Sequence, residues 1–448
     1  MKNLLIYIVI AFVVSGCNCQ KSDVESQCDK RLTYKVYDSS VEEASDWVKK
    51  YSNLDEAKAN IYKRLDILKT SSGEAIETPL QWEHEKKQVK EFFANSVYGK
   101  PLARPQKLEF KLLESGEVKD LNAIRKQFKI VATNNEKVYE FNVLVYIPKN
   151  VKNLPVFVSP NFTGNHTVWF DKKIILPNTY LRINKRVGIE DNSPSEQQRG
   201  KASWRHPIDK ILSRGYAFAT FCYCEVFPDH FKGAKDSVYQ IYPPRAKATA
   251  IPAWAWGNSR VLDLLETLPE IDAQKAIVIG HSRLGKTAIY TGVFDTRFAI
   301  TISNDSGCLG AATNRRNFGE SISHMAKSKG LNYWFVDELK NFGGYEVEKI
   351  PFDQSHFLAC VAPRGLYVAS ATADLWADPL GEYQSFKDAG KIYALYGAKN
   401  VPSQADKLYI QKQFLGDIAH HLRIGKHDIV EYDWLNFMDY ADKIFKRK

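Results

Sequence analysis

Short runs of small and β-branched apolar residues recur along the chain and are typical of buried β-strands. The runs cover residues 154–160, 216–222, 276–279, 298–303 and 365–371, and an alternating run at 137–146 predicts a further strand. Apolar positions at helical spacing predict helices at 254–265 and at 432–438. Because strands and helices alternate, the pattern predicts an α/β fold: a three-layer sandwich with a mostly parallel sheet covered on both faces.

The N-terminal hundred residues depart from this alternation. From about residue 30 to residue 100 the chain is polar, and apolar residues such as Val41, Ala44 and Val48 recur at helical spacing. This spacing predicts a helical extension that packs on the main domain. We therefore divide the chain into a tether with an N-terminal helical extension at 18–100 and one main domain at 101–448.

The first seventeen residues have the pattern of a targeting segment. Lys2 precedes an apolar run from Leu4 to Val14, which is too short to span a bilayer. The run ends in Val13-Val14-Ser15-Gly16-Cys17, which resembles a bacterial lipoprotein box. We predict that 1–17 is a lipoprotein signal peptide and that Cys17 carries the lipid. The alternative is plain secretion with cleavage nearby. Either way the protein is exported, and a lipoprotein would lie at the outer membrane or in the periplasm, held by its lipid anchor only.

Composition narrows the class of function. The chain has 448 residues, 44% of them hydrophobic, which suffices for a large packed core. Its net charge is +10, but it contains no long block of like charge, no zinc-finger spacing and no arginine-rich arm. We therefore predict no nucleic-acid partner, and an acidic polysaccharide suits the charge better. Export permits disulfides that the sequence cannot pair, and we interpret Cys222 and Cys224 as packing residues.

The stretch from Ala276 to Tyr290 is the strongest chemical signal. A strand-like run meets a Gly280-His281-Ser282 turn, and a segment compatible with a helix follows. This order is typical of the nucleophile elbow of α/β-hydrolases, in which a tight turn exposes the serine hydroxyl. The usual second glycine is displaced by one residue, since Leu284 holds its place and Gly285 follows. The pattern predicts Ser282 as a nucleophile and 101–448 as an α/β-hydrolase catalytic domain.

Acid and base candidates follow the elbow in the order found in α/β-hydrolases. Asp374 follows the strand at 365–371, and His427 lies after a glycine in a loop before the closing helix. The competing histidines, His420 and His421, could instead be surface residues. Asp378 precedes a proline and is interpreted as a turn residue. Asp305, at the end of the strand at 298–303, is the competing acid.

Two loops are expected to border the serine. In α/β-hydrolases the loop after an early strand gives one N–H group to the oxyanion hole, which makes Asn161 and Phe162 candidates. The polar segment 177–205 has the composition of an inserted surface loop, and loops of this length are often functional.

Several separated motifs resemble carbohydrate esterase family 15, the glucuronoyl esterases, in its bacterial form. The motifs are Gly280-His281-Ser282-Arg283-Leu284-Gly285-Lys286, Ser303-Asn304-Asp305-Ser306-Gly307, Arg315-Arg316-Asn317-Phe318-Gly319-Glu320, Ala362-Pro363-Arg364, Asp374-Leu375-Trp376-Ala377-Asp378-Pro379 and Gly425-Lys426-His427-Asp428. The first is similar to the family's G-x-S-R-x-G-K elbow, which accounts for the displaced glycine. The likeness covers roughly residues 100 to 445. Leu309 departs from it, because a glycine is expected there.

This resemblance implies a serine esterase that cleaves the ester between 4-O-methyl-glucuronic acid of xylan and an alcohol of lignin. By the same resemblance Ser282 attacks the carbonyl, His427 is the base and Arg283 helps the oxyanion hole. Lys286, Glu320 and Trp376 match family positions that hold the sugar. An indole offers a flat face to a pyranose, and the two charged groups suit sugar hydroxyls.

The family places its acid in two ways, either after the strand that follows the elbow or on the later loop. This chain has Asp305 at the first place and Asp374 at the second. An aspartate at the first place reaches less far than the family's glutamate. We therefore predict Asp374 as the acid, with Asp305 assisting or as the alternative.

Two other functions stay open at this point. One is a neighbouring activity, an acetyl xylan or feruloyl-type esterase, and the other is a glycan-binding lipoprotein without catalysis. No metal and no organic cofactor is predicted, because H-E-x-x-H, G-x-G-x-x-G and P-loop motifs are absent from the sequence. The expected partner is a uronic-acid-bearing xylan or lignin–carbohydrate ester, and the protein is expected to be a monomer.

Overall fold

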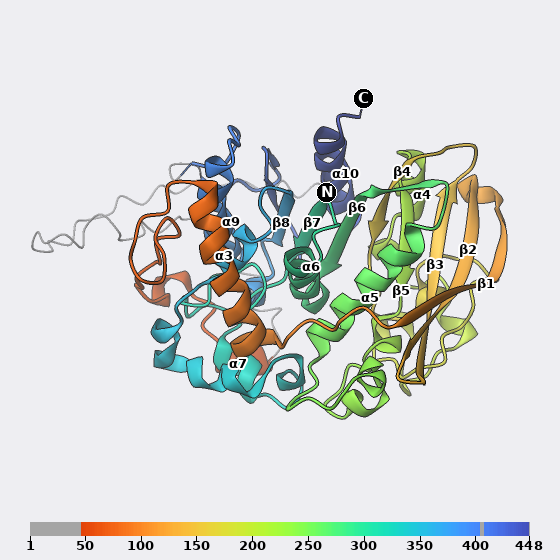
Figure 1. Ribbon diagram of the computed structural model, residues 1–448, viewed down its shortest axis with the longest axis horizontal. Coiled ribbons are helices and arrows are strands. Elements are labelled where there is room, and N and C mark those ends of the chain that lie inside the picture. The colour runs from red at the N-terminus through yellow and green to blue at the C-terminus, as the bar shows by residue number, and fades with distance from the viewer. Residues whose placement is uncertain (1–45, 404–406, 448) are drawn as a thin grey trace, which may run out of the picture.

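The computed structural model describes residues 46–403 and 407–447 (Figure 1). The predicted signal peptide, Cys17, and the apolar positions Val41 and Ala44 lie outside the described residues. In the described part, no helix is both long and apolar enough to cross a membrane.

A single mixed sheet runs through the described part of the chain and contains ten strands there. Its order is β1-β2-β3-β5-β4-β6-β7-β8-β10-β9. The strands are β1 (Lys107–Val118), β2 (Ala123–Asn134), β3 (Lys137–Pro148), β4 (Leu154–Val158), β5 (Ala217–Phe221), β6 (Ile271–His281), β7 (Ile300–Asn304), β8 (Gly365–Ala371), β9 (Phe414–Leu415) and β10 (Ala419–Arg423). The six strands from β5 to β10 in this order are parallel, whereas β1, β2, β3 and β9 pair antiparallel.

Helices cover both faces of the parallel part (Figure 1). The helices are α2 (Asp46–Tyr51), α3 (Pro79–Phe93), α4 (Ile208–Ser213), α5 (Ala250–Leu265), α6 (Arg283–Phe294), α7 (Ile322–Lys327), α8 (Gln354–Ala359), α9 (Pro379–Leu395) and α10 (Glu431–Phe445). In β4, Val156 and Val158 enter the core under α5 and α6, while Phe157 enters the core under α4 and α10. Strands that are buried on both faces read as continuous apolar runs, which is why the sequence identified them.

The predicted strands at 137–146, 154–160, 216–222, 298–303 and 365–371 are confirmed within a few residues, as are the helices α5 and α10. The strands β1 and β2 were not predicted from the sequence. β1 is largely exposed and carries no apolar run. The helix α9 was also not predicted, since it is buried on nearly every side and therefore lacks an amphipathic pattern. Cys222 and Cys224 are buried and free, as predicted for packing residues.

The N-terminal extension is only partly helical. Between α2 and α3, residues 52–78 form turns and irregular structure apart from one short 3₁₀-helix at Glu56–Lys58, so the prediction of helix from about 30 to 100 is wrong for most of this stretch. Thr78 and Gln81 form a capping box that starts α3. Val48 and Leu54 pack against Phe318 and Leu375, which belong to loops at the carboxyl edge of the sheet. The extension therefore rests on the loops that carry the candidate site.

Candidate active site

Ser282 lies at a sharp turn between β6 and α6. Its backbone has φ 57° and ψ −128°, a combination that non-glycine residues adopt at a cost and that is typical of a functional constraint. A Cβ at position 280 would lie 1.9 Å from the Leu284 carbonyl oxygen, and one at position 285 would lie 3.0 Å from Ser306 Cβ. The chain thus needs glycine at 280, and a side chain at 285 would force its neighbours to shift. Gly285 packs on the loop after β7, so the displaced glycine of the motif has a steric reason.

A cavity of about 190 Å³ opens at this turn. Ser282, His427 and Arg283 all line it, together with His281 and Phe162. The serine and the histidine are 145 residues apart in sequence, and both come from loops at the carboxyl ends of strands. In open α/β sheets this edge is where ligands bind.

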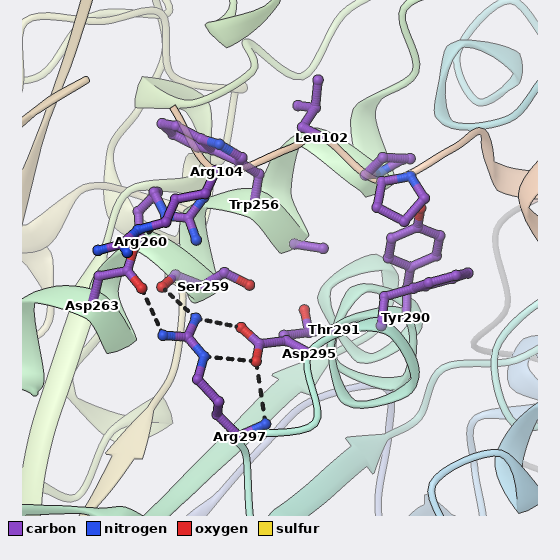
Figure 2. Close-up of a pocket in the computed structure, with 14 residues that line it drawn as sticks. Leu102, Arg104, Trp256, Ser259, Arg260, Asp263, Tyr290, Thr291, Asp295 and Arg297 are labelled. Carbon is purple, nitrogen blue, oxygen red and sulfur yellow. Dashed lines mark hydrogen bonds and ion pairs between the residues drawn. The ribbon is translucent and has the colours of Figure 1, made fainter. Parts of the chain in front are cut away.

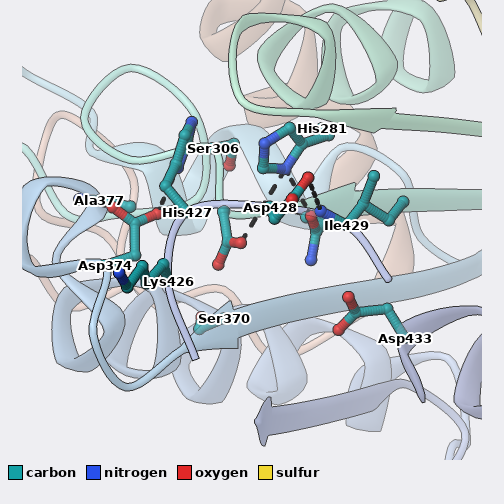
Figure 3. Close-up of polar contacts among 12 residues, drawn as sticks. His281, Ser306, Ser370, Asp374, Ala377, Lys426, His427, Asp428, Ile429 and Asp433 are labelled. Atoms are coloured by element: carbon teal, nitrogen blue, oxygen red, sulfur yellow. Dashed lines mark hydrogen bonds and ion pairs between the residues drawn. The ribbon is translucent and has the colours of Figure 1, made fainter. Parts of the chain in front are cut away.

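His427 is held by Asp374 (Figure 3). The distance from His427 Nδ1 to Asp374 Oδ2 is 2.5 Å, and the carboxylate is buried while the imidazole is 40% exposed. Asp374 also caps the turn at Leu375–Ala377, since its Oδ1 accepts a hydrogen bond from the Ala377 N–H. With Nδ1 donating to the carboxylate, Nε2 of the ring is the nitrogen that can accept a proton.

Asp305 provides a second carboxyl group in the same place. Ligand atoms of Asp305, Asp374 and His427 lie within 4.8 Å of one another, and Asp305 Oδ2 accepts from Arg423 Nη2 at 3.3 Å. Burial raises the pKa of Asp305 well above its usual value, and the Asp374 charge raises it further. A raised pKa disfavours the charged form of Asp305, whereas Arg423 favours it. Three ligand atoms this close could also hold a metal ion. Two of them, Asp374 Oδ2 and His427 Nδ1, already bond to each other.

The imidazole ring of His281 packs against the ring of His427. The two rings have centroids 4.4 Å apart, and His281 Nδ1 lies 2.6 Å from Asn304 Oδ1. Burial lowers the pKa of His281 well below its usual value, and the charge of His427 lowers it further. His281 is therefore a neutral packing partner. No role was predicted for His281, because it occupies the variable position of the elbow.

Arg283 is anchored by Asp229, a residue that sequence reasoning missed. Arg283 Nη1 forms an ion pair with Asp229 Oδ2, and its guanidinium stacks on Trp334 at 4.7 Å from the ring centroid. Asp229 also accepts hydrogen bonds from the Tyr223 and Tyr333 hydroxyls, each at 2.6 Å. Burial would raise the pKa of Asp229, but Arg283 and these other partners hold it at about 2. No motif marks Asp229, because Arg283 and Tyr333 lie far from it in sequence.

Lys286, Glu320 and Trp376 are also in contact with one another. Lys286 Nζ donates to the Ser306 carbonyl, to the Cys308 carbonyl at 2.6 Å and to Glu320 Oε2 at 2.6 Å. An ammonium has three N–H donors, so each one has a protein acceptor here. Trp376 Nε1 donates to Glu320 Oε1 at 3.0 Å. Lys286 therefore fixes Glu320 and, through it, the indole that the resemblance assigns to sugar binding.

The loop that carries Asp305 rests on a buried glutamate, Glu382 of α9. Its Oε1 accepts from the Ser306 and Gly307 N–H groups at 2.8 and 2.9 Å, and its Oε2 lies 2.5 Å from Ser370 Oγ. Burial raises the pKa of Glu382 to about 8. The sequence did not point to Glu382, since α9 itself was not recognised.

Glu382 is expected to make the protein less stable as the pH rises. Because its folded pKa of about 8 lies above the unfolded value of 4.5, the folded state keeps a proton that the unfolded chain releases. The stabilisation is full below about pH 4.5 and is lost as the pH approaches 8. The shift from 4.5 to about 8, at about 1.4 kcal/mol per unit, corresponds to roughly 5 kcal/mol.

Glu382→Gln should reproduce the neutral acid and so flatten this dependence. Denaturant unfolding at pH 5 and pH 8 measures it, with Glu74→Gln as a control that removes an exposed carboxylate. An unchanged pH dependence in Glu382→Gln would show that this carboxyl group is ionised in the folded protein.

The competing candidates lie elsewhere. His420 and His421 are buried in β10 and are not surface residues. His421 lies 2.8 Å from both the Tyr367 hydroxyl and Asp433 Oδ1, and His420 packs against aromatic rings. Asp378 is the N-cap of α9 at φ 53°, and its carboxylate binds Arg316. Arg316 also binds Glu56 at 2.5 Å, which links the N-terminal extension to the loop of Trp376.

The two loops expected near the serine are both present. Of the two oxyanion candidates, the Asn161 N–H is already bound to the Phe221 carbonyl at 2.9 Å, so that prediction is wrong, whereas Phe162 lines the cavity. The inserted segment 177–205 is not a simple surface loop, since several of its apolar residues are buried. It brings Arg182, Asn184 and Arg205 to the cavity wall.

A second cavity, of about 320 Å³, lies between α5, α6 and residues 101–104 (Figure 2). Arg297 bridges Asp263 and Asp295 there at 2.6 and 2.7 Å, and Arg260 donates to Asp263 at 2.6 Å. None of the predicted site residues lines it. Its paired charges tie α5 to α6, so we interpret this cavity as structural.

A parallel sheet with a strained serine after its central strand, and with a histidine–carboxylate pair at the same edge, defines an α/β-hydrolase. A family model described as glucuronyl esterase of fungi matches residues 164–397. The carbohydrate esterase MZ0003 from an unknown prokaryotic organism is 37% identical over 403 residues, which are 87% of this chain and 91% of that protein. The chain thus belongs to the glucuronoyl esterases of carbohydrate esterase family 15, which are carboxylic ester hydrolases.

Two further relatives match this chain over different lengths. The structure of a glucuronoyl esterase from Solibacter usitatus has a TM-score of 0.79 and 33% identity, covering 87% of this chain and 100% of that chain. A 4-O-methyl-glucuronoyl methylesterase from Hypocrea jecorina is 36% identical over 148 residues, or 32% of each protein. The chain therefore matches its bacterial relative over the whole domain and its fungal relative over about a third of the length.

Proposed function

We propose that this protein hydrolyses the ester between 4-O-methyl-glucuronic acid of glucuronoxylan and lignin alcohols. The observation that carries the proposal is the cavity shared by Ser282 and His427, with His427 held at 2.5 Å by Asp374. The Hypocrea jecorina and Solibacter usitatus relatives, named as glucuronoyl esterases, support the uronate as the acyl part.

Acylation begins when Ser282 Oγ attacks the uronate carbonyl and His427 Nε2 takes the hydroxyl proton. Asp374 holds the ring through Nδ1, which leaves Nε2 as the nitrogen that takes the proton, and it stabilises the imidazolium that forms. The bond to the alcohol then breaks, and His427 returns the proton to the departing oxygen. Water, activated by the same histidine, cleaves the acyl-enzyme to give the free uronic acid and to restore Ser282.

Charge on the carbonyl oxygen needs fixed donors during both steps. Arg283 lines the cavity and is held rigidly by Asp229 and Trp334, which suits a positive group that must not move during the reaction. The Phe162 N–H is the backbone donor that we assign beside it. Glu320 and Trp376, fixed by Lys286, are assigned to the sugar hydroxyls and to the pyranose face.

The proposal predicts a clear substrate preference. Purified protein should hydrolyse a benzyl ester of glucuronic acid faster than an acetylated xylo-oligosaccharide or a feruloylated arabinose. A serine-reactive phosphonate should label Ser282, as peptide mass spectrometry can show. A preference for the acetylated or feruloylated sugar would favour the neighbouring esterase activity, and no labelling of Ser282 would favour a binding protein.

We further infer that the protein is exported as a lipoprotein lipidated on Cys17 and works as a monomer without a metal or cofactor. Export and lipidation rest on the lipoprotein box in the sequence, and the absence of a metal or cofactor rests on the absence of their sequence motifs. A xylan ester is too large to enter a cell, so an exported enzyme suits such a substrate.

A further inference from the structure

The cavity at Ser282 has a cationic wall. Three charged side chains other than the imidazoles line it, and all three are arginines: Arg182, Arg205 and Arg283. Arg182 and Arg205 come from the inserted segment 177–205. The proposed function uses only Arg283, so the other two have no assigned role.

The charges of this wall do not cancel. Asp229 is shared by Arg283 and by Arg182, whose Nη1 lies 3.1 Å from Asp229 Oδ2. Asp428 is likewise shared by Arg205 and Arg186, at 2.8 and 2.6 Å. Four guanidinium groups therefore share two carboxylates, three of them from the cavity wall and the fourth, Arg186, from outside it.

Asp229 and Asp428 are both ionised, so the four arginines exceed them by two positive charges. Burial opposes ionisation, but the paired arginines lower the pKa of Asp229 and the pKa of Asp428. His281 is neutral, and Asp374 approaches the cavity only from behind the His427 ring. The wall thus keeps a surplus of positive charge. Arg182, which lines the cavity, is 42% exposed, so part of this charge is open to a ligand.

The sheet order shows which part of an ester meets this wall. The order β5-β4-β6-β7-β8 places the loop after β4 on one side of Ser282 and the loops after β7 and β8 on the other. Glu320 and Trp376 belong to the β7 and β8 side, whereas Arg182 and Arg205 follow β4. If the sugar lies against Glu320 and Trp376, the alcohol part points toward the arginines.

We infer that the arginine wall is a subsite for an alcohol that carries a carboxylate. This inference rests on the proposed function, because it takes the uronate as the acyl part. A cavity of about 150 Å³ can hold one benzene ring, so about 190 Å³ has room for one substituted ring. A partly exposed guanidinium pairs with a carboxylate through two parallel N–H donors.

Three matched esters of glucuronic acid test the subsite: benzyl, 4-carbamoylbenzyl and 4-carboxybenzyl. The last two have the same shape and differ in charge. At 20 mM salt we expect kcat/KM for the carboxylate to exceed that for the amide by about tenfold, and at 500 mM salt the ratio should fall to about two. Equal values for these two esters, with the benzyl ester still hydrolysed, would overturn the subsite and leave the proposed function standing. No hydrolysis of any of the three would overturn both.

Two variants test whether the arginine wall causes the preference for the carboxylate ester. Arg182→Gln should lose most of the preference, and the ratio of the two substrates cancels any general loss of activity. Lys185→Gln is the matched control, because it removes the same charge from an exposed neighbour that does not line the cavity. Loss of the preference in Lys185→Gln to the same extent as in Arg182→Gln would overturn the subsite in favour of a general surface charge.

Discussion

Ser282→Ala is expected to lower kcat for a benzyl glucuronate ester by about 10⁴-fold or more. Without the hydroxyl no acyl-enzyme can form, and the remaining donors and the sugar contacts can only assist direct attack by water. The measurement is steady-state hydrolysis, with the melting temperature recorded to show that the variant is folded. Alanine keeps a Cβ at the strained position, so the fold should change little.

The matched control is Ser213→Ala, which removes the hydroxyl of an exposed serine at the end of α4. It should keep the rate of the unmodified protein. Comparable rates for Ser282→Ala and Ser213→Ala would rule out Ser282 as the nucleophile and with it the proposed mechanism.

Asp374→Asn should lower kcat by about 10³- to 10⁴-fold, whereas Asp305→Asn should lower it by less than about tenfold. Asp374 accepts directly from His427 Nδ1, and an amide in its place would favour the wrong tautomer of the ring. Asp305 binds Arg423 and lies 3.9 Å from His281 Nδ1, without a hydrogen bond to His427. Burial raises the pKa of Asp305 well above its usual value, and asparagine keeps the size of this side chain without its titratable group.

The same assay for both variants, with unfolding curves beside it, separates the two roles. A loss in Asp305→Asn as large as that in Asp374→Asn would mean that the carboxyl groups act as one unit. A larger loss in Asp305→Asn would make Asp305 the main acid and contradict the assignment.

The parallel half of the fold was predictable because its strands are buried on both faces. An apolar run such as that of β4 needs no partner to be recognised, since every one of its residues enters a core. The antiparallel strand β1 was not predictable, because much of it faces solvent and its pairing with β2 is set by the neighbouring strand. The helix α9 was not predicted for the opposite reason. It is buried on nearly every side, so its sequence has no polar face that would reveal the helical spacing of apolar residues.

The candidate site divides in a similar way. Ser282 was visible in the sequence because an elbow needs a local run of strand, tight turn and helix, and Asp374 and His427 were visible by their order after it. Asp229 and Glu382 were invisible, since each acts through contacts with segments that are far away in sequence. The order of residues along the chain does not predict contacts between such distant segments.

The sequence by itself determined the fold class and the family and predicted the nucleophile, because those depend on short local patterns and on residue order. Only the tertiary structure decided that Asp374 rather than Asp305 bonds to His427, that Lys286 is committed to Glu320, and that four arginines share two carboxylates beside Ser282. Distances between charged groups on different loops fix these outcomes, and such distances exist only after the sheet has brought the loops to one edge.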